Sequence, residues 1–133
     1  MIGLDTNILA RFLLADDVGQ HEAARRLIDD AACSYWVPVT VVLELSWVLK
    51  GRGVPGPAAA RAIADLALLP NMRMQSAEAI AVAARAAEDG FEFADALHLA
   101  MSGKVEQFLS FDRQLVRRCR AGSHAFPPTR VPD

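Results

Sequence analysis

Near the start of the sequence stands IGLDTNILARFL, residues 2–13, whose pattern changes at Asp5. The apolar run Ile2–Leu4 has the length of a short strand. After the polar residues Asp5-Thr6-Asn7, apolar side chains recur with helical spacing at Ile8, Leu9, Phe12 and Leu13. The stretch therefore predicts a strand, a polar turn and a helix.

The same alternation of strand and helix patterns continues along the chain. Asp17 followed by Gln20 resembles a capping box and predicts a helix to about Ala31. The other predicted elements are strands at 35–37, 72–75 and 107–110, helices at about 41–50, 58–69, 77–88, 93–101 and 112–120, and an edge strand after Gly122. Because parallel strands need crossover connections, this order predicts an α/β fold with a central parallel sheet and helices on both faces. Ligands bind such sheets beyond the carboxyl ends of the strands.

The length of 133 residues predicts one domain, 1–133. The longest segment without Asp, Glu, Lys or Arg is Ala31–Leu43, which is too short to span a membrane. No basic segment precedes the first apolar run, so we expect no export signal and a cytoplasmic location. Cys33 and Cys119 are therefore expected to be reduced thiols rather than a disulfide.

The net charge of −2 hides an uneven distribution along the chain. Residues 1–112 carry nine basic and 15 acidic side chains, whereas residues 113–133 carry five Arg and one Asp. A basic end beside an acidic body is compatible with a phosphate backbone held at one rim and metal ions in the middle. A solvated last helix explains the same pattern.

Two acidic residues directly follow predicted strands. Asp5 follows Ile2–Leu4, and Asp112 follows Phe108–Phe111. If both strands belong to one parallel sheet, the two carboxylates share one end of it. Each Asp also precedes a predicted helix, so capping of a helix N-terminus is the alternative role.

Glu44 and Asp95 each lie among apolar residues at helical spacing. Glu44 has Val41 and Trp47 three residues away on either side, and Asp95 has Leu99 four residues on. A buried carboxylate is costly without a positive partner, and the nearest basic residue in the helix of Glu44 is six residues on. We predict that Glu44 lies within the apolar stripe, with a rim position that reaches water as the alternative.

Four gathered carboxylates would need a cation between them. Hard oxygen ligands favour Mg²⁺ or Mn²⁺, whereas zinc sites use paired Cys or His, which this sequence lacks at ligand spacing. Neither a Ser-His nor a Cys-His nucleophile pair is present, so the pattern indicates phosphoryl chemistry with a metal-activated water. Gly51–Gly56 matches the letters of a dinucleotide-binding loop, but it follows a helix and contains Pro55, so it is predicted to be an ordinary loop.

Four blocks of the sequence together resemble the acidic motifs of PIN-domain ribonucleases, and the short single-domain form is similar to the VapC toxins of bacterial toxin–antitoxin pairs. The blocks are LDTNIL at 4–9, VLELSWVL at 42–49, FADALHLA at 93–100 and SFDR at 110–113. The resemblance covers essentially the whole chain. It implies a three-layer α/β/α fold and an endoribonuclease that uses one or two Mg²⁺ or Mn²⁺ ions.

The resemblance also implies roles for individual residues. The catalytic and metal-binding set is Asp5, Glu44, Asp95 and Asp112. Thr6 and Asn7 match polar residues that orient the first aspartate, and Ser110 occupies a Ser/Thr position two residues before the last one. The family further implies a homodimer and a cognate antitoxin protein that covers the site.

Basic residues follow the last acidic block. Arg113, Arg117 and Arg120 are predicted to bind phosphates of an RNA substrate, since guanidinium groups match phosphate geometry. Arg117 and Arg120 are three residues apart and share one face of the predicted helix.

Two other functions are alternatives to the ribonuclease. A flavodoxin-like Mg²⁺ phosphohydrolase of small phosphate esters would need a second acid two residues after Asp5, where Asn7 stands. A non-catalytic module that only holds a metal would need a companion Lys. Lys104 precedes a predicted strand and would lie at the opposite end of the sheet from the acids. The ribonuclease is therefore the leading hypothesis.

Overall fold

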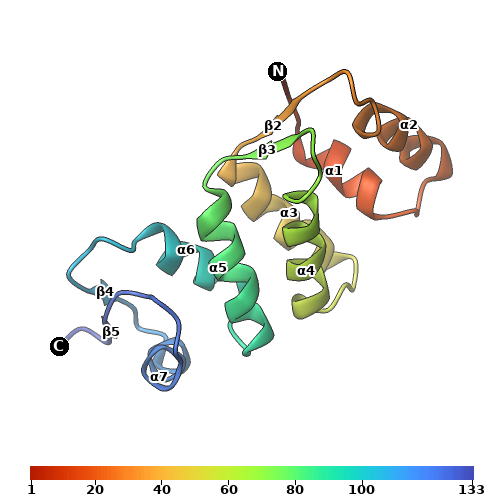
Figure 1. The fold of residues 1–133 in the computed structure, drawn as a ribbon. Helices are drawn as coiled ribbons and strands as arrows, with labels where there is room; N and C mark the ends of the chain where they lie inside the picture. Colours follow the sequence, from red (N-terminus) through yellow and green to blue (C-terminus); the bar gives the residue numbers. More distant parts are fainter. The chain divides into compact units, whose positions relative to one another are not determined.

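The computed structural model describes residues 1–133, which form seven helices and five short strands (Figure 1). Every strand pairing is parallel, and helices separate the strands along the chain, which confirms the predicted α/β class. None of the helices has the length and apolar character that a membrane span requires. The chain divides into two compact units, Met1–Ala77 and Glu78–Asp133, which are described in turn.

The first unit contains a three-stranded parallel sheet in the order β1 (Ile2–Gly3), β2 (Tyr35–Val37), β3 (Met72–Met74). The central strand pairs Tyr35 with Ile2 on one side and with Met72 on the other. Tyr35 and Val37 are fully buried, whereas Trp36 between them is partly exposed, as expected for alternating side chains. The Tyr35 hydroxyl donates a hydrogen bond to the carbonyl of Leu27, which ties the sheet to the preceding helix.

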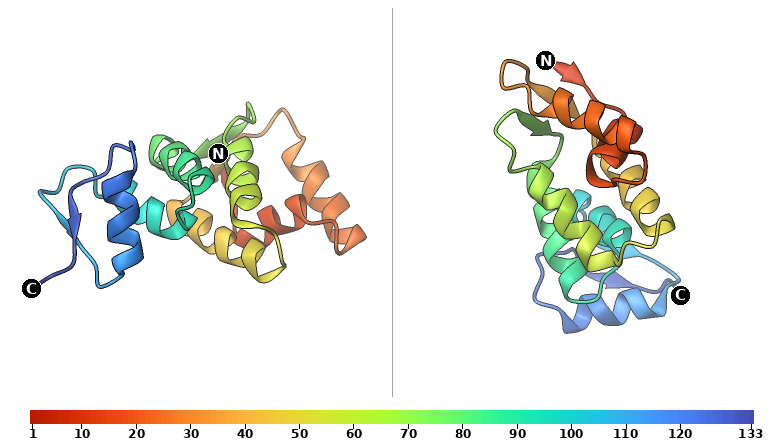
Figure 2. Two further views of the ribbon diagram at one scale, coloured as in Figure 1. Left: turned by 90° about the horizontal axis from the view of Figure 1, so that it is seen from below. Right: turned by 90° about the vertical axis from the view of Figure 1, so that its right-hand side faces the viewer.

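Four helices accompany this sheet: α1 (Thr6–Leu13), α2 (Val18–Ile28), α3 (Val39–Gly51) and α4 (Gly56–Leu66). Helix α1 packs against both α2 and α3, and α3 packs against α4 (Figure 2). Asp17 caps α2 by accepting a hydrogen bond of 3.0 Å from the backbone N–H of Gln20, as the sequence predicted. The buried face of α3 consists of Val42, Leu45, Ser46 and Leu49.

The second unit contains α5 (Ala77–Glu88), α6 (Phe93–Met101), β4 (Phe108–Leu109), α7 (Arg113–Ala121) and β5 (Thr129–Arg130). The first residue of α5, Ala77, is the last residue of the first unit. Strands β4 and β5 are parallel, and α7 packs against β5 (Figure 1). The rings of Phe91, His124 and Phe126 lie against one another and hold the tail on this unit. The edge strand predicted after Gly122 is therefore confirmed.

The structure differs from the sequence predictions in some element bounds and in one sheet pairing. Helix α2 ends at Ile28 rather than near Ala31, and α4 spans Gly56–Leu66 rather than 58–69. The strands before Asp5 and Asp112 also belong to different hydrogen-bonded sheets. The reason is that the backbone of β4 bonds to the tail, with Phe108 N–H donating to Pro128 and Ser110 N–H to Arg130.

Candidate active site

A cleft of about 200 Å³ lies within the first unit, between α1 and α3. Its lining residues are Asp5, Thr6, Asn7, Ala10, Arg11, Leu14, Glu44, Val48 and Arg52. We call it the acidic cleft, because it brings together Asp5 and Glu44 from distant segments. Two arginines, Arg11 and Arg52, share the same lining, and the sequence analysis did not single them out.

Asp5 occupies the N-cap of α1, where its Oδ1 accepts a hydrogen bond of 2.8 Å from the backbone N–H of Thr6. The side chain thus caps the helix, and this bond leaves its Oδ2 available. The Thr6 hydroxyl beside it is buried and has no hydrogen-bond partner. A buried unpaired hydroxyl is costly, so this oxygen indicates a place for a ligand in the cleft.

Glu44 lies on the exposed side of α3, and the prediction that it is buried in an apolar stripe is wrong. The helix buries Val42, Leu45, Ser46 and Leu49 instead, and Trp47, one turn from Glu44, is 52% exposed. Apolar residues occur on nearly all sides of α3, so their spacing does not identify the buried face. Glu44 therefore reaches water, as in the rim alternative, while it still lines the acidic cleft.

Asp95 lies in the first turn of α6 in the second unit and is partly buried. Burial raises the pKa of its carboxyl above the ordinary value, and the charges of Glu92 and Asp112 raise this pKa further. The charges of His98 and Arg118 lower the pKa of Asp95. Asp95 and Asp112 are thus close enough to repel each other, and a cation beside them would relieve this repulsion.

Asp112 is the N-cap of α7. Its Oδ1 accepts hydrogen bonds from the backbone N–H groups of Gln114 at 3.0 Å and Leu115 at 3.1 Å. The hydroxyl of Ser110 accepts a 3.0 Å hydrogen bond from the backbone N–H of Asp112, which fixes the turn between β4 and α7. As at Asp5, the capping bonds use one carboxylate oxygen and leave the other available.

The predicted substrate-binding arginines, Arg113, Arg117 and Arg120, are all exposed on α7. Arg118 is partly buried and lowers the pKa of Asp95, a role that the sequence analysis missed. No spacing rule could have revealed it, because Arg118 and Asp95 lie on different helices.

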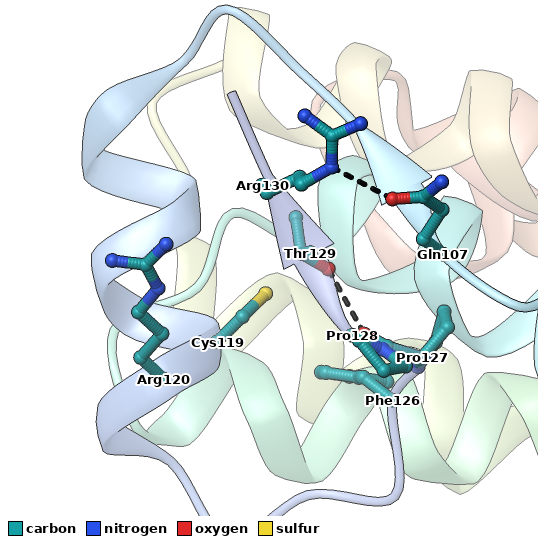
Figure 3. A pocket seen from close by; sticks show the side chains of 8 residues that line it. All are labelled: Gln107, Cys119, Arg120, Phe126, Pro127, Pro128, Thr129 and Arg130. Carbon is teal, nitrogen blue, oxygen red and sulfur yellow. Dashed lines mark hydrogen bonds between the residues drawn. The ribbon is translucent and has the colours of Figure 1, made fainter. Parts of the chain in front are cut away.

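A second cavity, of about 430 Å³, lies between α7 and the tail (Figure 3). In it Arg130 Nε donates a 2.7 Å hydrogen bond to Gln107 Oε1, and the Cys119 sulfur is directed toward Thr129. Burial raises the pKa of the Cys119 thiol and the charge of Asp95 adds to this, whereas the hydrogen bond with Thr129 lowers it. No carboxylate lines this cavity, so it lacks the ligands of a metal site.

The structure gathers the four predicted acids as two pairs, Asp5 with Glu44 and Asp95 with Asp112. No group of three or more His, Cys, Asp or Glu side chains lies close enough to hold a metal ion. A pair nevertheless fits Mg²⁺, which is commonly bound through one or two carboxylates and keeps several waters. The unpaired Thr6 hydroxyl supplies a further oxygen beside the first pair. The donor chemistry therefore fits a hard divalent cation.

In a comparison with known families, the model of the PIN domain matches residues 2–121, which include all four of these acids. The chain belongs to the PIN domain family. Neither the curated proteins nor the solved structures contain a significant match. PIN domains are generally nucleases and typically use divalent metals, so this PIN domain is placed among hydrolases of nucleic acids. Membership is also consistent with the predicted three-layer α/β/α fold.

The unpaired hydroxyl of Thr6 leads to a first test on this PIN domain. Thr6→Val removes the hydroxyl, and the metal-free protein is expected to melt at the same or a higher temperature, because an unmade hydrogen bond costs about 1–3 kcal/mol. In Mg²⁺ the variant should gain less thermal stability than the unmodified protein, since an ion stabilises only through the contacts it makes. Thermal unfolding in EDTA and in Mg²⁺ measures both effects.

The matched control is Thr40→Val at an exposed position of α3. A metal-free Thr6→Val protein that melts lower would show that the hydroxyl has a structural role.

Proposed function

We propose that this PIN domain is a Mg²⁺- or Mn²⁺-dependent endoribonuclease that acts as the toxin of a toxin–antitoxin pair. The observation that carries the proposal is the acidic cleft, where Asp5 and Glu44 meet beside the unpaired Thr6 hydroxyl. Neither His nor Cys lines this cleft, so it offers oxygen ligands and no activated nucleophile. Such a site supports hydrolysis by water rather than a covalent intermediate.

In this proposal the residues that bind one or two ions are Asp5, Glu44, Asp95 and Asp112, the acids that the PIN family motifs contain. A bound divalent ion lowers the pKa of water and stabilises the charge that develops on the phosphate. The chain's own part is to hold the carboxylates in place. Capping bonds fix Asp5 and Asp112 through Oδ1 and leave Oδ2 for the ion. Thr6, Asn7 and Ser110 are proposed to orient these groups.

Arg113, Arg117 and Arg120 are proposed to bind phosphates of the RNA chain. Their exposure on α7 supports this role, because each guanidinium can reach a ligand without rearrangement of the core. Glu44 is exposed as well, so a long polymer has access to the acidic cleft. The proposed substrate is therefore an RNA chain rather than a small buried ester.

The proposal includes residues 1–133 as one PIN domain in the cytoplasm, which forms a homodimer and is inhibited by an antitoxin protein. Several large apolar side chains are about half exposed or more and are available for such contacts. They are Trp47, Leu68, Met101, Val105 and Phe111. Exposed apolar side chains of this kind are what a dimer or an antitoxin would cover.

The test is cleavage of single-stranded RNA by the full chain freed of any co-purified partner. Cleavage is expected to stop in EDTA and to return with Mg²⁺ or Mn²⁺. Asp5→Asn should abolish cleavage in both metals and leave the protein folded, because Asn caps helices as well as Asp does. The appearance of RNA fragments on a gel measures the activity, and thermal unfolding checks the fold.

Asp65→Asn, which removes an exposed carboxylate from α4, is the matched control and should cleave normally. Cleavage that continues in EDTA would contradict the proposal. Hydrolysis of a small phosphate ester without RNA cleavage would favour the phosphohydrolase. Binding of Mg²⁺ with neither activity would favour the non-catalytic module.

A further inference from the structure

Two arginines of the acidic cleft are held by one carboxylate. Arg11 lies on α1, and Arg52 is the C-cap of α3. The Nη1 atom of Arg11 lies 2.9 Å from Asp16 Oδ1, and the Nη1 atom of Arg52 lies 2.5 Å from Asp16 Oδ2. Asp16, in the loop between α1 and α2, thus binds one guanidinium with each of its oxygens. We call these three residues the arginine clamp.

The arginine clamp presents unused hydrogen-bond donors next to the carboxylates of the acidic cleft. A guanidinium has five N–H groups in a planar fork, and the bond to Asp16 uses Nη1 of each arginine. Both arginines line the cleft together with Asp5 and Glu44. The Arg11 side chain is 30% exposed and that of Arg52 is 50% exposed, so a ligand can reach their remaining donors.

The charge of the clamp favours an anion. The hydrogen bond from Arg11 and the charges of both arginines lower the pKa of Asp16, so its carboxyl is counted as ionised. Two guanidinium groups and one carboxylate then leave a formal charge of about +1. A divalent ion at Asp5 and Glu44 would cancel their two charges and leave the clamp as the positive group of the cleft. An exposed ion pair by itself adds little to stability.

We propose that Arg11 and Arg52 bind a phosphate of single-stranded RNA next to the scissile bond, and that Asp16 is a positioning residue that aims them. The inference rests on the proposed ribonuclease function and adds a phosphate subsite to it. Bidentate pairing between guanidinium and phosphate supplies the recognition. The occupant is an RNA phosphate because the cleft combines cation ligands with guanidinium groups, and neighbouring phosphodiesters of one strand can contact a bound cation and the guanidinium groups together.

The test measures the affinity of the full chain for a single-stranded RNA over a series of salt concentrations in Mg²⁺. Every protein in the series also carries Asp95→Asn, which prevents cleavage during the measurement. Arg11→Gln with Arg52→Gln is expected to weaken binding by about tenfold to a hundredfold, the range for hydrogen bonds to charged groups. The slope of log affinity against log salt should fall by about 0.7 for one lost phosphate contact.

Asp16→Asn distinguishes the positioning of the two arginines from the effect of the protein's overall charge on RNA binding. This substitution makes the protein more positive, which by itself would strengthen RNA binding. If Asp16 aims the arginines, RNA binding becomes weaker instead. Asp29→Asn is the matched control, because it removes an exposed carboxylate at the C-cap of α2 that pairs with Arg25, outside the cleft. Arg25→Gln with Arg26→Gln is the matched control for the arginine pair, because it also removes two exposed guanidinium groups, and thermal unfolding checks that each protein is folded.

Two results would overturn the inference. One is Asp16→Asn binding RNA as tightly as Asp29→Asn. The other is that the loss of both clamp arginines lowers the affinity no more than Arg25→Gln with Arg26→Gln does. That result would leave the clamp as a structural contact or a site for an acidic protein segment. Steady-state cleavage with Asp95 intact separates this inference from the proposed function. A protein that cleaves RNA in a metal-dependent way, with a KM unchanged by the clamp substitutions, would contradict the phosphate subsite alone.

Discussion

Asp95→Asn is expected to lower the rate of RNA cleavage by about a thousandfold or more. A divalent ion supplies several kcal/mol of charge stabilisation in the transition state, and each tenfold in rate corresponds to about 1.4 kcal/mol. Asn keeps the shape of the side chain but loses the negative charge that attracts the ion. The partly buried position of Asp95 makes this loss hard to compensate, because bulk water has limited access to the site.

The same substitution is expected to raise the melting temperature of the metal-free protein. Burial and the charges of Glu92 and Asp112 raise the pKa of Asp95 in the folded state. Between its unfolded value of 3.8 and the raised value, the folded state binds more protons than the unfolded state. The free energy of unfolding therefore falls as pH rises through this window and stays lowered at neutral pH. Asn has no charge, so the substitution removes this loss in the free energy of unfolding.

The two effects are measured on one preparation, by RNA cleavage in Mg²⁺ and by thermal unfolding in EDTA. Asp133→Asn is the control for the loss of one charge in the same unit, since its side chain is fully exposed. The control should cleave RNA normally and have the same melting temperature as the unmodified protein. An Asp95→Asn protein that cleaves RNA at the normal rate would remove Asp95 from the site. A lower melting temperature in EDTA would show that Asp95 has a structural partner.

Leu45→Ala is expected to lower the free energy of unfolding by about 2–5 kcal/mol, the range for a leucine deleted from a packed core. Leu45 is fully buried on α3, directly after Glu44 in the chain. Domains are commonly stable by about 5–15 kcal/mol, so this loss is a large fraction of the total. It should also reduce cleavage, because α3 carries Glu44 into the acidic cleft. Urea unfolding followed by circular dichroism measures the change.

Leu68→Ala is the matched control, since Leu68 is 79% exposed in the turn after α4. It is expected to change the free energy of unfolding by less than about 0.5 kcal/mol. Equal effects of the two substitutions would mean that α3 does not bury the face that contains Leu45.

The order of strands and helices could be predicted because each change of pattern has a local cause. Apolar residues at Ile2–Leu4 give way to helical spacing after Asp5, and Asp17 caps α2 through its own side chain. The pairing of Asp5 with Glu44 was predicted only in part. The motifs named both residues, but the spacing of apolar residues gave Glu44 the wrong environment.

Contacts between distant segments could not be predicted in the same way. The clamp joins Arg11, Asp16 and Arg52, and nothing in the sequence links the last of these to the other two. Similarly, β4 has only two residues, so its sequence does not determine which strand it pairs with. Ion pairs and edge pairings depend on the three-dimensional path of the chain, and a one-dimensional pattern does not contain that path.

Cys119 gives the second unit a chemical indicator of the charge at Asp95. Burial raises the pKa of this thiol most, and the negative charge of Asp95 adds to it. Thiolate is the form that reacts with alkylating reagents, so a raised pKa slows the reaction. Any event that neutralises Asp95 therefore makes Cys119 more reactive. The side chain has no part in the proposed hydrolysis, so a cation bound at Asp95 as proposed is expected to raise its alkylation rate even without a substrate.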